Sequence, residues 1–150
     1  MNDEALAIAI MSGLCTRFEG VFLKPYLCPA RVPTIGIGST FYEDGTPVRM
    51  TDPPITKERA VRLLMRSVMT IYLPAVKKLC PRIDTPGRLA AILDFCYNLG
   101  AGNLQASTLR KYINAGLWAK VPDELMKWVK GGGIVLPGLK RRRTAEAELI

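Results

Sequence analysis

The sequence predicts a single α+β domain with a small β-containing N-terminal lobe, a larger helical C-terminal lobe and a functional cleft between them. The chain has 150 residues, of which 49% are apolar, so it is long enough for one well-formed core. Residues 20–50 are rich in Pro, Gly, Thr, Ile and Val, as short strands and turns are. From residue 56 onward the apolar residues recur with helical spacing.

The first element is a predicted helix over residues 3–18. It contains the uncharged run Ala5–Cys15, whose eleven residues are fewer than the ~20 that span a bilayer. Acidic residues precede the run, unlike the basic flank of a signal peptide. We therefore interpret it as a helix packed on the domain. The alternative is the remnant of a longer hydrophobic anchor, which leaves open a transient membrane association through this helix.

The next segment, 19–55, is predicted to be the β lobe. Thr34, Ile35 and their apolar neighbours Val32 and Ile37 indicate a strand, and residues 43–46 indicate a turn. A hairpin or a three-stranded sheet fits this pattern.

Helices are predicted for the rest of the chain. Thr56 is a candidate N-cap, Pro74 is expected to kink the helix that follows, and Thr85-Pro86 begins another helix. Gly100 and Gly102 should end that helix, and more helices are expected near 106–115, 119–130 and 138–149. The predicted organisation is one domain, 1–150, made of an N-terminal helix (1–18), the β lobe (19–55), connecting helices (56–82) and a helical lobe (83–150).

Composition excludes several kinds of chemistry. There is no His, so Ser-His-Asp machinery and His-ligated metals are excluded, and we expect no metal and no cofactor. Four cysteines, Cys15, Cys28, Cys80 and Cys96, contain no CxxC pair. We expect buried thiols, although the sequence also allows one or two disulfides. The net charge of +8 fits a nucleic acid, an anionic membrane, an acidic cell-wall polymer or simply a basic surface.

Three polar residues near the start are the candidate catalytic group. Eight residues separate Glu19 from Cys28, and five separate Cys28 from Thr34. A helix end, a turn and a strand can bring them to one cleft, with Glu19 as the acid and the thiol and hydroxyl orienting a water. Taken singly, each also fits a structural role: a surface carboxylate, a small buried thiol and an ordinary strand Thr.

Three blocks of the chain, in order, resemble the signatures of the phage-type lysozymes, the endolysins of glycoside hydrolase family 24. The first, Phe18–Gly38, has the family's catalytic spacing on Glu19, Cys28 and Thr34; the others are Asp94–Leu109 and Trp128–Glu146. Cys28 stands where the best-studied branch has Asp, and Ser39 stands where many members have His.

The resemblance implies a lysozyme-like fold and an activity. The implied enzyme is a muramidase that hydrolyses the β-1,4 bond between N-acetylmuramic acid and N-acetylglucosamine and so lyses the bacterial host. It also implies synthesis in the host cytoplasm, action on peptidoglycan in the periplasm, a monomer, and no nucleic-acid partner. Asn98, Ser107 and Thr108 are the implied sugar-binding residues, although lone polar residues are often helix caps.

Two other functions remain open from the sequence. A lytic transglycosylase also needs one acid but forms an internal anhydro sugar. A non-enzymatic binding module for cell wall or nucleic acid would depend on basic residues such as Lys140–Arg143. A salt-bridged helix start is the structural explanation of that run, and it is the one we favour.

Overall fold

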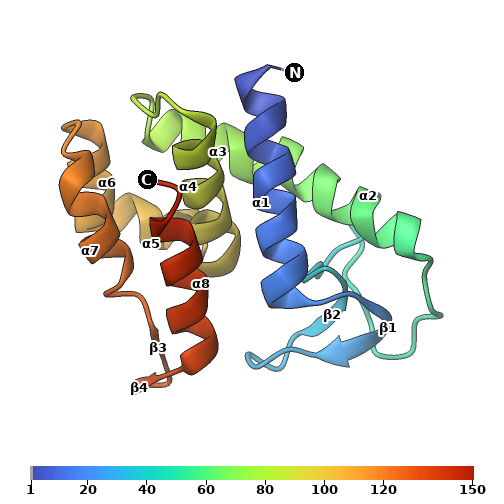
Figure 1. The fold of residues 1–150 in the computed structure, drawn as a ribbon. Helices are drawn as coiled ribbons and strands as arrows, with labels where there is room; N and C mark the ends of the chain where they lie inside the picture. Colours follow the sequence, from blue (N-terminus) through green and yellow to red (C-terminus); the bar gives the residue numbers. More distant parts are fainter. Residues whose placement is uncertain (1) are drawn as a thin grey trace. The chain divides into compact units, whose positions relative to one another are not determined.

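The structure is a computed structural model that describes residues 2–150 and divides into two compact units (Figure 1). One, here called the helical unit, consists of Met1–Leu14 and Tyr72–Ile150, and the other, the β unit, is Cys15–Ile71. Helix α1 (Asp3–Glu19) contributes residues to both. The predicted helix over 3–18 is therefore confirmed, but it belongs to two units instead of forming a segment of its own.

The β unit is built on an antiparallel hairpin of β1 (Phe22–Leu27) and β2 (Pro33–Gly36). The register shifts between Phe22 and Tyr26, where Pro25 cannot donate a ladder hydrogen bond. The predicted hairpin is confirmed, although Ile37 lies just beyond β2. Helix α2 (Lys57–Ser67) contacts both strands.

The helix that follows the β lobe changes its winding before Pro74. Thr56 caps α2 as predicted, because its hydroxyl accepts from the Arg59 N–H at 3.1 Å. A π-helix, Val68–Tyr72, then precedes α3 (Leu73–Leu79). Pro74 has no N–H and its ring clashes with the carbonyl four residues earlier, so the chain widens there to five-residue spacing. The predicted kink is thus a π-turn.

The helical unit surrounds α4 (Pro86–Leu99), which begins where predicted and is capped by the Thr85 hydroxyl. Seven consecutive residues, Ala90–Cys96, are buried, so α4 has no solvent-facing side over two turns. Its neighbours include α3, α5 (Ala101–Ala106) and α8 (Pro137–Ala147). The remaining helices of this unit are α6 (Thr108–Asn114), the 3₁₀ turn η2 (Trp118–Lys120) and α7 (Val121–Leu125).

One element of the helical unit was not predicted. Where a helix was expected over 119–130, the chain forms only η2 and α7, and a short hairpin of β3 (Lys130–Gly131) and β4 (Ile134–Val135) follows. Pro122 lies in the first turn of α7, where its missing N–H is tolerated, and the glycines after Lys130 favour a hairpin turn. Among residues 2–150, no helix is both long and apolar enough to cross a bilayer.

Candidate active site

The last residue of α1 carries the candidate acid. Asn2 begins this helix by accepting the Ala5 N–H at 2.7 Å, and Gly20 ends it with a φ of +75°. Glu19 is partly buried, and its side chain lies against the backbone of Gly38. A Cβ added at Gly38 would lie 3.2 Å from the Glu19 carboxyl carbon, at a φ of +74° that disfavours other residues. The second glycine of the strand motif therefore holds space for this carboxyl group.

Cys28 and Thr34 lie together where β1 turns into β2. The Cys28 N–H donates to the Val32 carbonyl at 3.2 Å, and the Arg31 N–H donates to the Cys28 carbonyl at 2.7 Å. Arg31 is the one non-glycine residue in the described chain with a positive φ, 61°, which closes this turn. Thr34 is buried, and its hydroxyl donates to the Val32 carbonyl at 2.8 Å. The same hydroxyl forms a hydrogen bond with the Cys28 thiol.

The pKa of Cys28 is lowered by its turn. Burial alone would raise it, but the hydrogen bonds that the thiol forms with the backbone at Val32 and Ala30 and with the Thr34 side chain together outweigh that effect. No disulfide joins the cysteines of residues 2–150, and Cys15, Cys80 and Cys96 are buried. Burial raises the pKa of Cys80 to about 11 and that of Cys96 to about 12. Cys28 is therefore the thiol that is both accessible and inclined to ionise.

Tyr26 lies within electrostatic range of both Glu19 and Cys28. Its pKa is raised, first by burial and then by the negative charges of Glu19 and Cys28. The Tyr26 ring packs against Phe22, with 4.4 Å between ring centroids. Tyr26 lies within the sequence block Phe18–Gly38, but β1 ends at Leu27, so strand alternation does not extend to Cys28 and did not point to a role for Tyr26.

This arrangement can place one acid near a polar pair. The Thr34 donor is directed to Val32, so the lone pairs of its hydroxyl can accept a hydrogen bond from a water. The Cys28 sulfur offers a second, weaker acceptor. Within residues 2–150, no cluster of three metal-ligating side chains is present. The chemistry that this group supports is therefore acid catalysis with an oriented water.

The three implied sugar-binding residues lie in the helical unit and have different surroundings. Ser107 is buried and caps α6: its hydroxyl accepts from the Arg110 N–H at 3.0 Å and donates to the Leu104 carbonyl at 2.7 Å. Thr108 is exposed at the next position. Asn98, at the end of α4, accepts from the Arg143 guanidinium at 2.6 Å.

Beside Asn98 lies a cluster of buried charges. Arg142 holds both carboxylate oxygens of Asp94, at 2.8 and 2.9 Å. Arg143 and Glu146 form an ion pair at 2.9 Å, and both side chains are fully buried. Burial, with the neighbouring Asp94 carboxyl group, raises the pKa of Glu146 well above its usual range. The predicted pairing of the basic run with the acids that follow it is confirmed for Arg143 with Glu146, whereas Arg142 pairs with Asp94 of α4.

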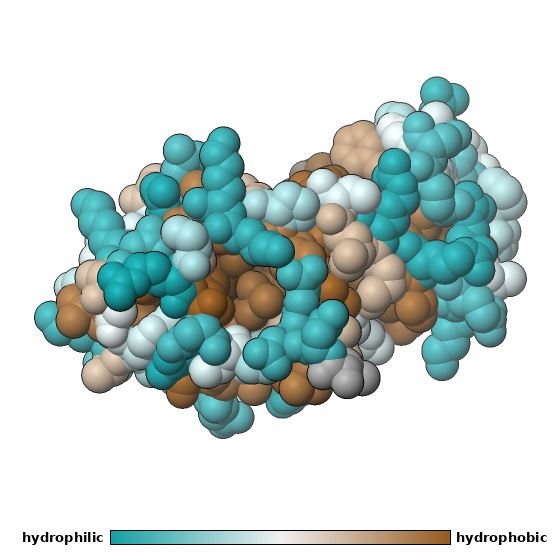
Figure 2. All heavy atoms as spheres, turned by 90° about the horizontal axis from the view of Figure 1, so that it is seen from above, coloured by the Kyte–Doolittle hydropathy of each residue, from teal (hydrophilic) through white to brown (hydrophobic). Residues whose placement is uncertain are grey.

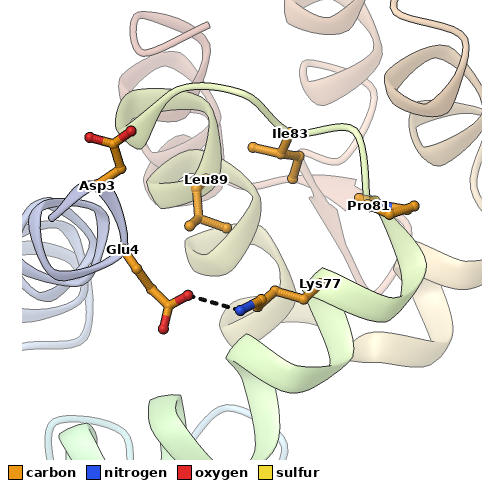
Figure 3. Close-up of a pocket in the computed structure, with 7 residues that line it drawn as sticks. Asp3, Glu4, Lys77, Pro81, Ile83 and Leu89 are labelled. Carbon is orange, nitrogen blue, oxygen red and sulfur yellow. Dashed lines mark hydrogen bonds and ion pairs between the residues drawn. The ribbon is translucent and has the colours of Figure 1, made fainter.

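A separate cavity of about 410 Å³ lies in the helical unit, near the start of α1 (Figure 3). Its floor is apolar, and the ion pair between Glu4 and Lys77, 2.9 Å long, lies at its edge. Apolar hollows between hydrophilic side chains are also visible on the face drawn in Figure 2. None of the candidate catalytic residues lines this cavity; its lining is Asp3, Glu4, Lys77, Cys80, Pro81, Ile83 and Leu89.

Most of the chain matches a family of known proteins. The phage lysozyme family matches residues 16–146. The chain belongs to this family. The structure is similar to an endolysin from Escherichia coli O157:H7 phage FAHEc1, with a TM-score of 0.83 and 31% identity over 93% of this chain and 89% of that one. The expected lysozyme-like α+β fold is thereby confirmed.

Two relatives differ in how much of their length this chain covers. The SAR-endolysin of Bacteriophage PS119 is 33% identical over 152 residues, which cover 95% of this chain and 86% of that protein. The endolysin of Bacillus phage B103 is 36% identical over 138 residues, 91% of this chain but 50% of that protein. The chain thus spans about half the length of the Bacillus phage relative.

Proposed function

We propose that this chain is a muramidase of the endolysin type, which hydrolyses the N-acetylmuramic acid to N-acetylglucosamine bond of peptidoglycan in the periplasm and lyses the host of a phage. The observation that carries the proposal is the grouping of Glu19, Cys28 and Thr34 in one compact unit, at the spacing of the resemblance. Tyr26 lies near enough to Glu19 and Cys28 for their charges to raise its pKa. Family membership supports the reaction class.

In this mechanism Glu19 is the general acid. Its carboxyl group protonates the glycosidic oxygen as the bond breaks and positive charge develops on the sugar ring. A water held by Thr34 and by Cys28 attacks the anomeric carbon, and the proton that it loses returns through solvent to the Glu19 carboxylate. Gly38 leaves room beside its backbone for the carboxyl group. We propose inversion at the anomeric carbon, on the strength of the family resemblance.

The helical unit contributes substrate contacts in this proposal. Thr108 is exposed and can reach a sugar hydroxyl, and the Asn98 amide retains N–H donors because its oxygen accepts from Arg143. We assign Ser107 a supporting part, since both hydrogen bonds of its hydroxyl go to backbone groups. By capping α6, it fixes the position of Thr108.

Turbidity loss of outer-membrane-permeabilised Gram-negative cells tests the proposal. Glu19→Gln keeps the shape of the side chain and removes its proton, so lysis should fall by about 10²–10⁴-fold. Glu43→Gln is the matched control, because Glu43 is an exposed carboxylate of the same unit, paired with Arg59 at 3.2 Å. The control should lyse cells at the normal rate, and both variants should keep the native circular dichroism spectrum.

The released fragments separate this proposal from its alternatives. Hydrolysis leaves a reducing sugar that has gained water, whereas a transglycosylase leaves an internal anhydro ring, and membership of a lysozyme family favours hydrolysis. A non-enzymatic module would bind the wall and release nothing. Substantial lysis by folded Glu19→Gln, or anhydro products from the normal protein, would refute the mechanism.

A further inference from the structure

The β3–β4 hairpin presents an ordered apolar tip. Lys130 pairs with Val135 and Gly131 with Ile134, so Gly132 and Gly133 form a two-residue turn. Both have positive φ, +59° and +80°, as a type I′ turn requires. A Cβ at Gly131 would lie only 2.6 Å from Leu136 Cδ1, so Leu136 packs across the hairpin. The hairpin is therefore held both by its glycine turn and by the packing of Leu136 against Gly131.

The side chains of this tip face solvent. Ile134 is 68% exposed and Val135 is 49% exposed, and every residue from Gly132 to Gly138 is exposed and uncharged. Ile134 has the largest exposed fraction among the exposed large apolar side chains of residues 2–150. Because alternate strand residues point to opposite sides, these two side chains project from both faces of the hairpin. The tip is convex, so it does not form a pocket for a small molecule.

Basic residues without acidic partners flank the tip. Residues 125–145 contain no Asp or Glu. Arg142 and Arg143 are committed to buried carboxylates, and Lys127 pairs with Glu124 at 2.6 Å. The other three cations, Lys130, Lys140 and Arg141, are exposed and form no ion pair within residues 2–150.

We propose that this hairpin docks on an anionic lipid surface, with Ile134 and Val135 inserted at the headgroup boundary and the three flanking cations against lipid phosphates. Aliphatic side chains at a convex tip, with cations around it, match the apolar and charged layers of such a surface. A glycan fits less well, because its hydroxyls would lose hydrogen bonds against aliphatic groups. Two copies of this face would bring like charges together.

Vesicle binding tests the proposal in the absence of peptidoglycan, so its outcome does not depend on the proposed enzymatic activity. The probes are vesicles of phosphatidylcholine and phosphatidylglycerol in equal parts, and vesicles of phosphatidylcholine alone. The normal protein should co-sediment with the first and not with the second, and less so as salt rises. The double variant Ile134→Ser, Val135→Ser keeps the net charge and should bind at least about tenfold more weakly.

A matched control separates the hairpin from apolar surface in general. Met69 and Ile71 of the β unit are 48% and 53% exposed, so Met69→Ser, Ile71→Ser removes similar apolar area elsewhere. That variant should bind like the normal protein. In Ile134→Trp, vesicles should shift the emission of the new indole to shorter wavelength, a change that general charge attraction does not produce.

Three results would overturn the proposal. Equal binding by the Ile134→Ser, Val135→Ser variant would show that net charge alone attracts the protein. Binding of the normal protein to purified peptidoglycan but not to vesicles would assign the tip to the wall. Self-association that the same variant abolishes, measured by sedimentation velocity, would make the tip an interface between copies.

Discussion

Replacing Arg142 with Met tests whether the buried charge cluster supports the helical unit. Arg142 and Asp94 are 4% and 0% exposed at their side chains, and their two hydrogen bonds are 2.8 and 2.9 Å long. Met fills a similar volume but leaves the Asp94 carboxylate buried without its principal cation. Removing one partner of such a pair typically costs about 3–5 kcal/mol. For a chain of this length that corresponds to a fall in Tm of roughly 6–20 °C.

Urea unfolding followed by circular dichroism measures this cost, and two further variants calibrate it. Lys77→Met breaks the Glu4 ion pair, whose side chains are 40% and 59% exposed, and should cost at most about 1 kcal/mol. Asp94→Leu combined with Arg142→Met removes both charges and should recover most of the stability lost by Arg142→Met alone. If Arg142→Met costs no more than Lys77→Met, or the double variant is the least stable, the reasoning about desolvated charge is refuted.

Three further predictions concern the β unit. Iodoacetamide should label Cys28 alone in the native protein, because the other cysteines are buried. The labelling rate should level off at a lower pH than in the urea-unfolded chain, because the pKa of Cys28 is lowered. An equal pH midpoint of the labelling rate in the native and unfolded proteins would contradict this. Thr34→Ala should lower turnover more than wall binding, because an oriented water acts in the transition state; the reverse pattern in binding and lysis assays would make Thr34 structural. Ser39→Ala should stabilise the protein by roughly 1–3 kcal/mol, because the buried Ser39 hydroxyl has no hydrogen-bond partner; an unchanged or lower Tm would show that a water satisfies it.

Local signals in the sequence were enough for much of the fold. Thr56 was predicted as a cap because a hydroxyl before an apolar-periodic run commonly caps a helix, and it accepts the expected backbone N–H. Pro86 predicted the start of α4, because Pro is common at the first position of a helix. Pro74 had to disturb its helix, but the sequence could not choose between a kink and a π-turn. That choice depends on how the flanking apolar residues pack.

Features that depend on long-range contacts could not be predicted in the same way. Tyr26 lies in a strand whose existence depends on pairing with β2, and Pro25 argues against a strand when read alone. The pairing of Arg142 with Asp94 joins residues 48 positions apart. The spacing of Glu19, Cys28 and Thr34 was visible in the sequence, whereas the part of Gly38 in making room for the carboxyl group required coordinates.

The division of the chain has a consequence for the order in which it folds on the ribosome. The β unit is one continuous stretch, Cys15–Ile71, so it can fold as soon as that stretch has emerged. The helical unit joins the first fourteen residues to a segment that begins at Tyr72. The start of α1, whose Glu4 pairs with Lys77, must therefore wait until α3 has been synthesised before it meets its partner. During that interval its apolar residues are exposed, as transient apolar surface that chaperones bind.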